Sequence, residues 1–240
     1  MFAEDEARLL VESAGSESEL RRMIDRRVAG DPLEYILGWV EFCGLRIAVD
    51  EGVFVPRQRT AFLVDLGTAR IRPDSTVLDL CCGCGAIGLA LATRVPDIEL
   101  YATDVEAIAV ECARRNLEPS GGQVFLGDLF APLPDTLRGS VDLIAANVPY
   151  VPTDAIALMP PEAREHEPVI TLDGGGDGLD VLRRAAGEAA GWLAPGGFLI
   201  IEVSEEQAPF AADAFRRGGL TAEVFSDDDL YATAIVGRKI

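Results

Sequence analysis

Short apolar runs of strand length alternate with amphipathic stretches of helix length from residue 76 to the C-terminus. The runs predict seven strands, and several of the stretches between them predict helices. Strands that alternate with helices are typical of a doubly wound α/β sheet, mostly parallel, with helices on both faces. The last two runs lie so close together that we expect the last strand to be antiparallel. The expected strands cover residues 76–80, 98–102, 124–126, 141–145, 198–203, 221–225 and 233–236, and the clearest helices cover 86–93 and 106–116.

A helical region and a small hairpin are expected before this sheet. A capping box at residues 16–19 opens one helix, which the glycine and proline of residues 30–32 end. Strand character over residues 40–49 is interrupted by a glycine, which indicates a hairpin, and residues 53–55 read as a strand that enters a turn. A further helix is expected over residues 58–70. We therefore expect three parts: a short helical region (1–38), a linker with the hairpin (39–57) and the main α/β domain (58–240).

The strongest local signal is the glycine-rich run Val77–Gly88, which reads as a strand, a turn and a helix start. Gly83 and Gly85 lack side chains where a ligand has to approach the backbone closely. With Gly88 they also fit the spacing of nicotinamide dinucleotide sites. Asp79, however, ends the strand just before the turn, where an anion would lie beside a pyrophosphate. A carboxylate there suits the ammonium group of S-adenosylmethionine, so we predict this cofactor on a Rossmann-like domain.

Carboxylates follow the next two predicted strands and suit the other end of that cofactor. Asp104 comes about 20 residues after the glycines, where a carboxylate can accept hydrogen bonds from both ribose hydroxyls. Its alternative role is to cap the helix that follows. Asp128 is placed to accept from the exocyclic amine of adenine, and its alternative is a solvated loop residue. The predicted cofactor site is completed by Cys81, Val105, Leu129 and Asn147.

The run Asn147–Tyr150 directly follows the predicted strand 141–145, at the sheet edge where ligands bind in doubly wound folds. It resembles the Asn-Pro-Pro-Tyr signature of methyltransferases that act on a planar nitrogen. An amide nitrogen is a poor nucleophile, and the Asn147 side-chain oxygen and a neighbouring backbone carbonyl can accept its N–H bonds and orient it. Tyr150 can stack on the planar group. We predict Asn147, Val148, Pro149 and Tyr150 as catalytic residues.

Charge and composition limit which partners the protein is expected to bind. The net charge is −19, from 21 Lys and Arg against 40 Asp and Glu, which argues against a nucleic-acid substrate because phosphate-binding proteins usually carry a basic patch. We find no run of about 18 apolar residues and no signal peptide, so we expect a cytoplasmic protein without a membrane span. We also expect a monomer. Five cysteines and one histidine lack the spacing of a zinc site, so we expect no metal.

Ordered matches from about Arg26 to the C-terminus resemble the protein-glutamine N5-methyltransferase family, which modifies peptide chain release factors. The resemblance implies a class I methyltransferase fold, S-adenosylmethionine as cofactor and a helical region that docks the release factor. It also implies that Thr60 meets the methionine end of the cofactor and that Asn147, Pro149, Tyr150 and Glu167 bind the substrate glutamine. The matching stretches are residues 29–38, 41–45, 55–57, 147–150, 164–168, 172–174, 177–179 and 193–197 together with the glycine-rich run.

The chain departs from the family pattern in four places. Val148 replaces the first proline of the Asn-Pro-Pro-Tyr signature, which removes a fixed φ angle. Cys81 replaces a glycine, Arg59 replaces an acidic residue, and the N-terminal helical region is shortened. These departures leave the cofactor assignment in place. They keep three substrates open: a glutamine in a release factor, a small-molecule or other protein amide acted on by a divergent paralogue, and an adenine in nucleic acid.

Overall fold

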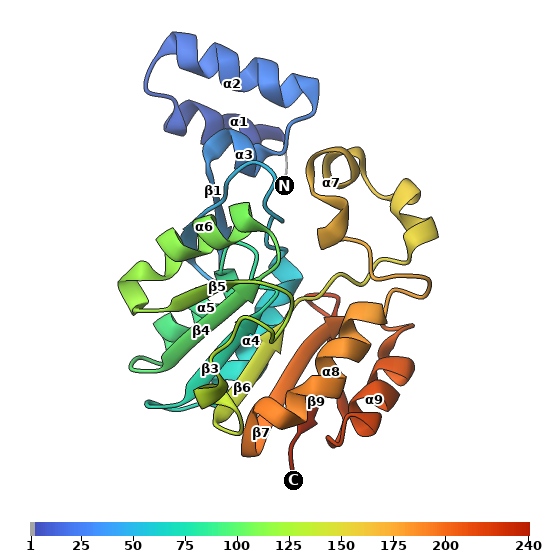
Figure 1. Cartoon of the computed structure of the whole chain (residues 1–240). Helices are drawn as coiled ribbons and strands as arrows, with labels where there is room; N and C mark the ends of the chain where they lie inside the picture. Colours follow the sequence, from blue (N-terminus) through green and yellow to red (C-terminus); the bar gives the residue numbers. More distant parts are fainter. Residues whose placement is uncertain (1–2) are drawn as a thin grey trace.

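A seven-stranded sheet forms the centre of the molecule, and helices cover both of its faces (Figure 1). The structure is a computed structural model that describes residues 3–240, so Met1 and Phe2, the first residues of the predicted helical region, lie outside the described part. The strand order is β5-β4-β3-β6-β7-β9-β8. β9 pairs antiparallel with both of its neighbours, β7 and β8, and the other strand pairs of this sheet are parallel, which confirms the prediction for the last strand. The strands are β3 (Thr76–Leu80), β4 (Glu99–Asp104), β5 (Gln123–Leu126), β6 (Val141–Ala146), β7 (Leu193–Val203), β8 (Glu223–Asp227) and β9 (Ala232–Arg238).

The alternation of side chains along each strand produces the two helical layers. Val77 and Leu78 are both fully buried, but they belong to different hydrophobic clusters because successive side chains point to opposite faces. Burial on both faces explains why the strands read as continuous apolar runs. One cluster includes residues of α4 (Ala61–Thr68), α5 (Ala86–Arg94) and α6 (Ala107–Leu117), and the other includes residues of α8 (Asp180–Trp192) and α9 (Ala208–Arg217).

Three N-terminal helices pack around a small cluster of their own. They are α1 (Ala3–Ser13), α2 (Glu17–Ala29) and α3 (Leu33–Leu37), and their buried cluster contains Leu10, Met23 and Leu33. Ser16 Oγ accepts a hydrogen bond from Glu19 N at 3.2 Å, as the predicted capping box requires. The division of the chain at residues 38 and 57 stays a prediction. None of the helices in residues 3–240 is long and apolar enough to cross a membrane.

The predicted hairpin is present as β1 (Trp39–Phe42) and β2 (Leu45–Ala48). Its two-residue turn places Cys43 and Gly44 at φ angles of 53° and 76°. Two positive φ angles are what the tight turn between two antiparallel strands requires, so the glycine predicted to interrupt the strand sits in the turn.

The prediction of a strand over residues 53–55 is wrong, because their backbone groups bond outside any sheet. Val53 O accepts a hydrogen bond from Tyr35 Oη at 2.8 Å. Val55 N donates to Glu167 Oε1 at 3.2 Å. Both valines are buried, which gives the sequence its strand-like alternation, but the segment is a connection that leads into the cavity described below.

An irregular segment between β6 and α8 lies beside the N-terminal helices (Figure 1). Arg27 of α2 forms ion pairs with Glu6 of α1, at 2.8 Å, and with Glu162 of this segment. The segment contains η4 (Thr153–Leu158), α7 (Pro161–His166) and η5 (Val169–Thr171), and the other short 3-10 helices are η1 (Gln58–Thr60), η2 (Glu118–Ser120) and η3 (Asp135–Leu137).

Candidate active site

A cavity of about 380 Å³ opens where β3, β4 and β6 end, at the carboxyl edge of the parallel strands. Small-molecule sites usually occupy roughly 300–1,000 Å³, and ligands of doubly wound sheets bind at this edge. Three predicted site residues, Asp79, Gly85 and Glu167, are not among the residues that line the cavity. The others all line it: Thr60, Cys81, Gly83, Asp104, Val105, Asp128, Leu129, Asn147, Val148, Pro149 and Tyr150.

The glycine-rich loop between β3 and α5 contributes one wall. Cys81, Gly83 and Gly85 have φ angles of 57°, 55° and 80°. Glycine adopts this region freely, whereas a residue with a Cβ is strained there by about 1–2 kcal/mol. The backbone at position 81 therefore favours glycine, the residue that the family resemblance leads one to expect there. A Cβ on Gly85 would also lie 3.1 Å from Leu117 Cγ, so Gly85 allows close packing between the loop and α6.

Asp79 lies beneath this loop, outside the cavity wall. Its side chain is fully buried, and Oδ2 accepts a hydrogen bond from Gly88 N in the first turn of α5 at 2.8 Å. Oδ1 has no hydrogen-bond partner within residues 3–240. Burial raises the pKa of Asp79 to about 8, the bond from Gly88 N opposes this rise, and the nearby Asp104 adds to it. Contact of Asp79 with the ammonium group of the cofactor stays a prediction.

The Asp104 carboxylate holds the loop and also faces the cavity. Oδ2 accepts from Gly83 N at 2.8 Å, and Oδ1 accepts from Glu106 N at 2.9 Å. Burial raises the pKa of Asp104, and both backbone N–H groups oppose the rise. A carboxylate offers about four acceptor positions, so two are left for ligand hydroxyls. The cap-like contact and the predicted ribose contact are therefore compatible.

Asp128 lines the cavity next to Leu129, which has a positive φ of 48°. Its Oδ2 forms an ion pair with Arg184 of α8 at 2.5 Å, and both side chains are about half exposed. The sequence did not indicate Arg184, because this partner comes from a helix 56 residues further along the chain. The contact of Asp128 with adenine stays a prediction.

The Asn147 side chain at the end of β6 is oriented by Thr60. Asn147 Nδ2 donates to Thr60 Oγ1 at 3.4 Å, and Thr60 is only 2% exposed. This bond uses the amino group of Asn147, so its carbonyl oxygen Oδ1, for which no bond to the described chain is recorded, is available as an acceptor. The sequence predicted both residues, but it assigned Thr60 to the cofactor, and the contact with Asn147 was not foreseen.

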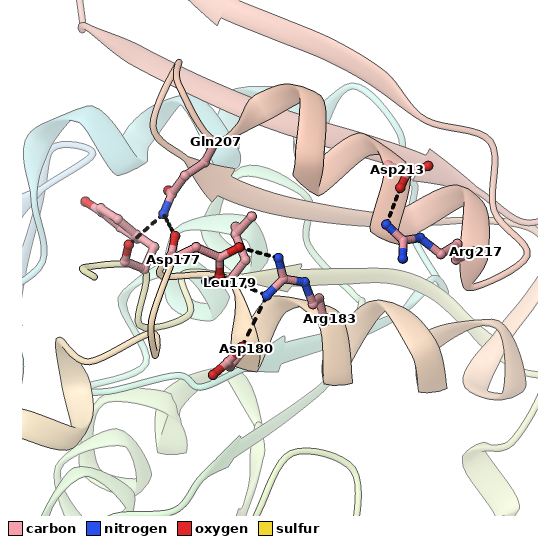
Figure 2. Close-up of polar contacts among 8 residues, drawn as sticks. Asp177, Leu179, Asp180, Arg183, Gln207, Asp213 and Arg217 are labelled. Carbon is pink, nitrogen blue, oxygen red and sulfur yellow. Dashed lines mark hydrogen bonds and ion pairs between the residues drawn. The ribbon is translucent and has the colours of Figure 1, made fainter. Parts of the chain in front are cut away.

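Gln207 anchors the other end of the reaction motif. Its Nε2 donates to Tyr150 O at 2.8 Å and to Asp177 O at 3.1 Å, and its Oε1 accepts from Ser204 N at 3.2 Å. Figure 2 shows the amide of Gln207 at the Asp177 backbone and the Asp177 side chain facing Arg183. The buried amide thus joins three loops at the carboxyl edge of the sheet, and sequence reasoning missed it.

The contacts of Arg59 were also not predicted from the sequence. Arg59 Nε donates to Glu202 Oε1 at 3.0 Å, and the guanidinium also donates to Tyr150 Oη. Its Cζ lies 5.9 Å from the centroid of the Tyr150 ring. Arg59 therefore lies directly against the reaction motif.

Glu167 does not line the cavity, but it holds two residues of the segment that leads into it. Both of its carboxylate oxygens accept from Arg57 Nη2, at 2.8 and 2.7 Å, and Oε1 also accepts from Val55 N. Burial raises the pKa of Glu167, while Arg57 opposes this rise. Arg57 itself lines the cavity. The geometry gives Glu167 a part in placing Arg57, and the predicted contact of Glu167 with the substrate remains a prediction.

The cysteines of the loop are free thiols in an acidic setting. Burial raises the pKa of the Cys81 thiol, and the carboxylates of Asp104 and Asp79 raise it further. A protonated thiol is a weak nucleophile, so a reactive electrophile in the cavity is not exposed to a thiolate at this position. Within residues 3–240, no group of three or more His, Cys, Asp or Glu side chains is arranged to hold a metal ion.

Comparisons of the sequence with known proteins find methyltransferases. A family model described as "Methyltransferase small domain" matches residues 45–160. The chain is 38% identical over 222 residues to a release factor glutamine methyltransferase of Geobacter sulfurreducens, covering 92% of this chain and 77% of the relative. It is 39% identical over 222 residues to that of Deinococcus radiodurans, covering 90% and 78%. For Streptomyces coelicolor the values are 35% over 228 residues, covering 93% and 77%.

Solved structures support the fold. A methyltransferase from Pyrococcus furiosus has a TM-score of 0.61 at 17% identity, covering 93% of this chain and 98% of that chain. A ribosomal protein L11 methylase from Lactobacillus delbrueckii subsp. bulgaricus has a TM-score of 0.57 at 19% identity, covering 81% and 86%. The predicted class I methyltransferase fold is confirmed.

Proposed function

Since the chain belongs to the family of release factor glutamine methyltransferases, we propose that it methylates the side-chain nitrogen of a glutamine in a peptide chain release factor, with S-adenosylmethionine as methyl donor. The orientation of Asn147 supports this most directly. Thr60 holds Nδ2, which leaves Oδ1 as an acceptor in a cavity that extends to the glycine-rich loop. The function therefore rests on a site that can hold a cofactor and an amide together.

The cavity residues fit S-adenosylmethionine. Gly83 at a positive φ allows the ligand to approach the backbone, and Asp104 has acceptor positions left for ribose hydroxyls. Thr103 also lines the cavity, and its buried hydroxyl has no partner within residues 3–240, so it is available to a polar group of a ligand. When bound, the sulfonium of the cofactor supplies an electrophilic methyl group.

The chain itself contributes orientation and hydrogen bonding at the amide. The lone pair of an amide nitrogen is delocalised into its carbonyl, so the nitrogen becomes nucleophilic only when it pyramidalises. Asn147 Oδ1 and the backbone carbonyl of Val148 can accept its two N–H bonds and favour that geometry, and the Tyr150 ring can stack on the amide plane. The same groups could orient an adenine amino group, which is why the substrate needs its own test.

The test combines binding with mapping of the product. Titration calorimetry should show S-adenosylmethionine binding to the wild type, and binding weakened by about tenfold or more in Asp104→Asn, which loses charge-assisted bonds to the ribose. Mass spectrometry of a purified release factor should show one methylated glutamine with the wild type and none with Asn147→Ala. Methylation of an adenine-containing nucleic acid or of a small amide, without methylation of the release factor, would show that the substrate is a different one.

We further propose that residues 1–38 dock the release factor and that the enzyme works as a cytoplasmic monomer. The net charge of −19 disfavours contact with a phosphate backbone and supports a protein substrate. Removal of the helical region should raise the KM for the release factor and leave the Kd for S-adenosylmethionine unchanged.

A further inference from the structure

Glu202 is a buried carboxylate on the strand next to the one that leads into the reaction motif. Ala146 of β6 pairs with Ile201 of β7, so the residues that follow them, Asn147 and Glu202, lie at neighbouring positions of the sheet edge. The Glu202 side chain is only 2% exposed, and its Oε1 accepts a hydrogen bond from Arg59 Nε at 3.0 Å. A charged pair is therefore built into the edge of the sheet where ligands bind.

Arg59 connects this carboxylate to the side chain of Tyr150. Its guanidinium donates to the Tyr150 hydroxyl as well as to Glu202, and its Cζ lies 5.9 Å from the centroid of the Tyr150 ring. The planar guanidinium fork can hold two acceptors in a fixed relative orientation. The backbone of Tyr150 is held separately, because Gln207 Nε2 donates to Tyr150 O at 2.8 Å. Tyr150 is thus fixed at both ends, at its carbonyl and at its hydroxyl.

Stability alone does not account for the pair of Glu202 and Arg59. The free energy needed to take a carboxylate out of water often exceeds the attraction to its partner, so apolar residues in the same place are often more stabilising. Glu202 Oε2 has no hydrogen-bond partner within residues 3–240, which adds to the unfavourable side. What the pair does provide is one defined geometry beside the reaction motif.

We propose that Glu202 is a positioning residue that acts through Arg59, and that the pair fixes the plane of the Tyr150 ring on which the acceptor amide stacks. The inference rests on the proposed function, because it places a glutamine amide against Tyr150. Glu202 neutralises Arg59, so neither charge has to bind the substrate. Without the pair the ring is free to change its orientation, and the amide is then aligned less often with the methyl group.

A double-mutant cycle tests this directly. Tyr150→Phe keeps the ring and loses the contact with Arg59, and it should lower kcat for the release factor by about tenfold, with KM and the Kd for S-adenosylmethionine within about twofold. Glu202→Gln should lower kcat by a similar factor. The double variant Tyr150→Phe, Glu202→Gln should be about as fast as Tyr150→Phe alone, because the pair then has no hydroxyl to hold.

Arg59→Lys separates the positioning of Tyr150 from the balance of charge. Lysine keeps a positive charge for Glu202, but its ammonium group is a point charge and lacks the planar fork. The variant should unfold at nearly the urea concentration of the wild type and still lose about tenfold in kcat, and this loss should disappear in the Tyr150→Phe background. If Glu202→Gln does not fold, Arg59→Lys completes the same cycle.

The control is Asp213→Asn, which changes a carboxylate to an amide in an exposed ion pair with Arg217 on α9 and should keep the wild-type kcat. Losses that multiply in the double variants, or a wild-type kcat in Tyr150→Phe, would overturn the role of Glu202 and leave the proposed function standing. Absence of any methylated glutamine with the wild type would overturn both.

Discussion

Replacement of Gln207 by leucine should impair catalysis without impairing cofactor binding. The Gln207 side chain does not line the cavity, but its amide donates to Tyr150 O at 2.8 Å and to Asp177 O at 3.1 Å. Leucine is similar in size and has no donor. The carbonyl of Tyr150, three residues after Asn147, would then lose its partner, and the reaction motif would lose its fixed position.

The magnitude follows from the number of bonds lost. Gln207 is 8% exposed, and the leucine variant removes two donated bonds and the one accepted from Ser204 N at 3.2 Å. At about 1 kcal/mol for each bond, the free energy of unfolding should fall by about 3 kcal/mol. A shift of about 1 Å in a catalytic group can cost about 100-fold in rate, so we expect kcat to fall by about 10- to 100-fold.

The assay separates this positioning role from general destabilisation. The kcat and KM for the release factor are measured at a temperature where both proteins are fully folded, beside the Kd for S-adenosylmethionine from calorimetry. Gln207→Glu adds a second readout, because a carboxylate faces two carbonyl oxygens and regains a donor only when protonated. Its activity relative to wild type should therefore rise as the pH is lowered. The control is Arg217→Gln, whose ion pair lies farther along α9 and is exposed (Figure 2), so its effect should stay within about 0.5 kcal/mol.

Two results would refute this reasoning. A Gln207→Leu enzyme with wild-type kcat would show that the bonds to Tyr150 and Asp177 do not hold the reaction motif. A parallel loss of cofactor affinity would show that the glutamine supports the whole cavity and not the motif alone.

Three other predictions concern the loop and the reaction motif. Cys81→Gly should raise the free energy of unfolding by about 0.5 kcal/mol, since the relief of a positive φ outweighs the added freedom of the unfolded chain, and a lower midpoint in urea would contradict the strain argument. Asp79 has a folded pKa of about 8 against about 3.9 when unfolded, so the folded state holds a proton that the unfolded state releases. The free energy of unfolding should therefore fall as the pH rises from 4 through 8. In urea titrations at pH 5.5 and 8.5 it should fall less for Asp79→Asn than for the wild type, and an equal fall in both proteins would show that another group is responsible. Val148→Pro should keep kcat within about twofold, because Val148 N donates no recorded hydrogen bond in residues 3–240, and a large loss would show that the backbone at this position differs from that of proline.

The sequence predicted those site residues whose positions follow from strand topology. Gly83, Asp104 and Asn147 each lie at the end of a strand or within three residues after it, and parallel strands bring their carboxyl ends to one edge of the sheet. Local spacing along the chain was enough in each case. The same argument identified Asp79 as part of the motif, but it did not show that the side chain points beneath the loop.

Residues that depend on distant partners were not predictable in this way. Arg59 and Glu202 are 143 positions apart, and Arg57 and Glu167 are 110 apart. No periodicity relates such pairs, and a charged residue in an irregular segment reads as solvated until its partner is known. The strand wrongly predicted over residues 53–55 has the same cause, because its backbone partners come from Tyr35 and Glu167.

These distant contacts hold the reaction motif without the local constraint of a proline at position 148. A proline at position 148 would fix one φ angle, which is a local constraint on the motif. Here the motif is instead held at both ends, by Thr60 at Asn147 and by Gln207 at Tyr150 O. Val148 itself is 1% exposed, so packing also restricts it. The rigidity that a proline at position 148 would supply locally is thus supplied by contacts from Thr60 and Gln207 and by packing, and changes at Gln207 or Thr60 should be more harmful in the present chain than in a Val148→Pro variant.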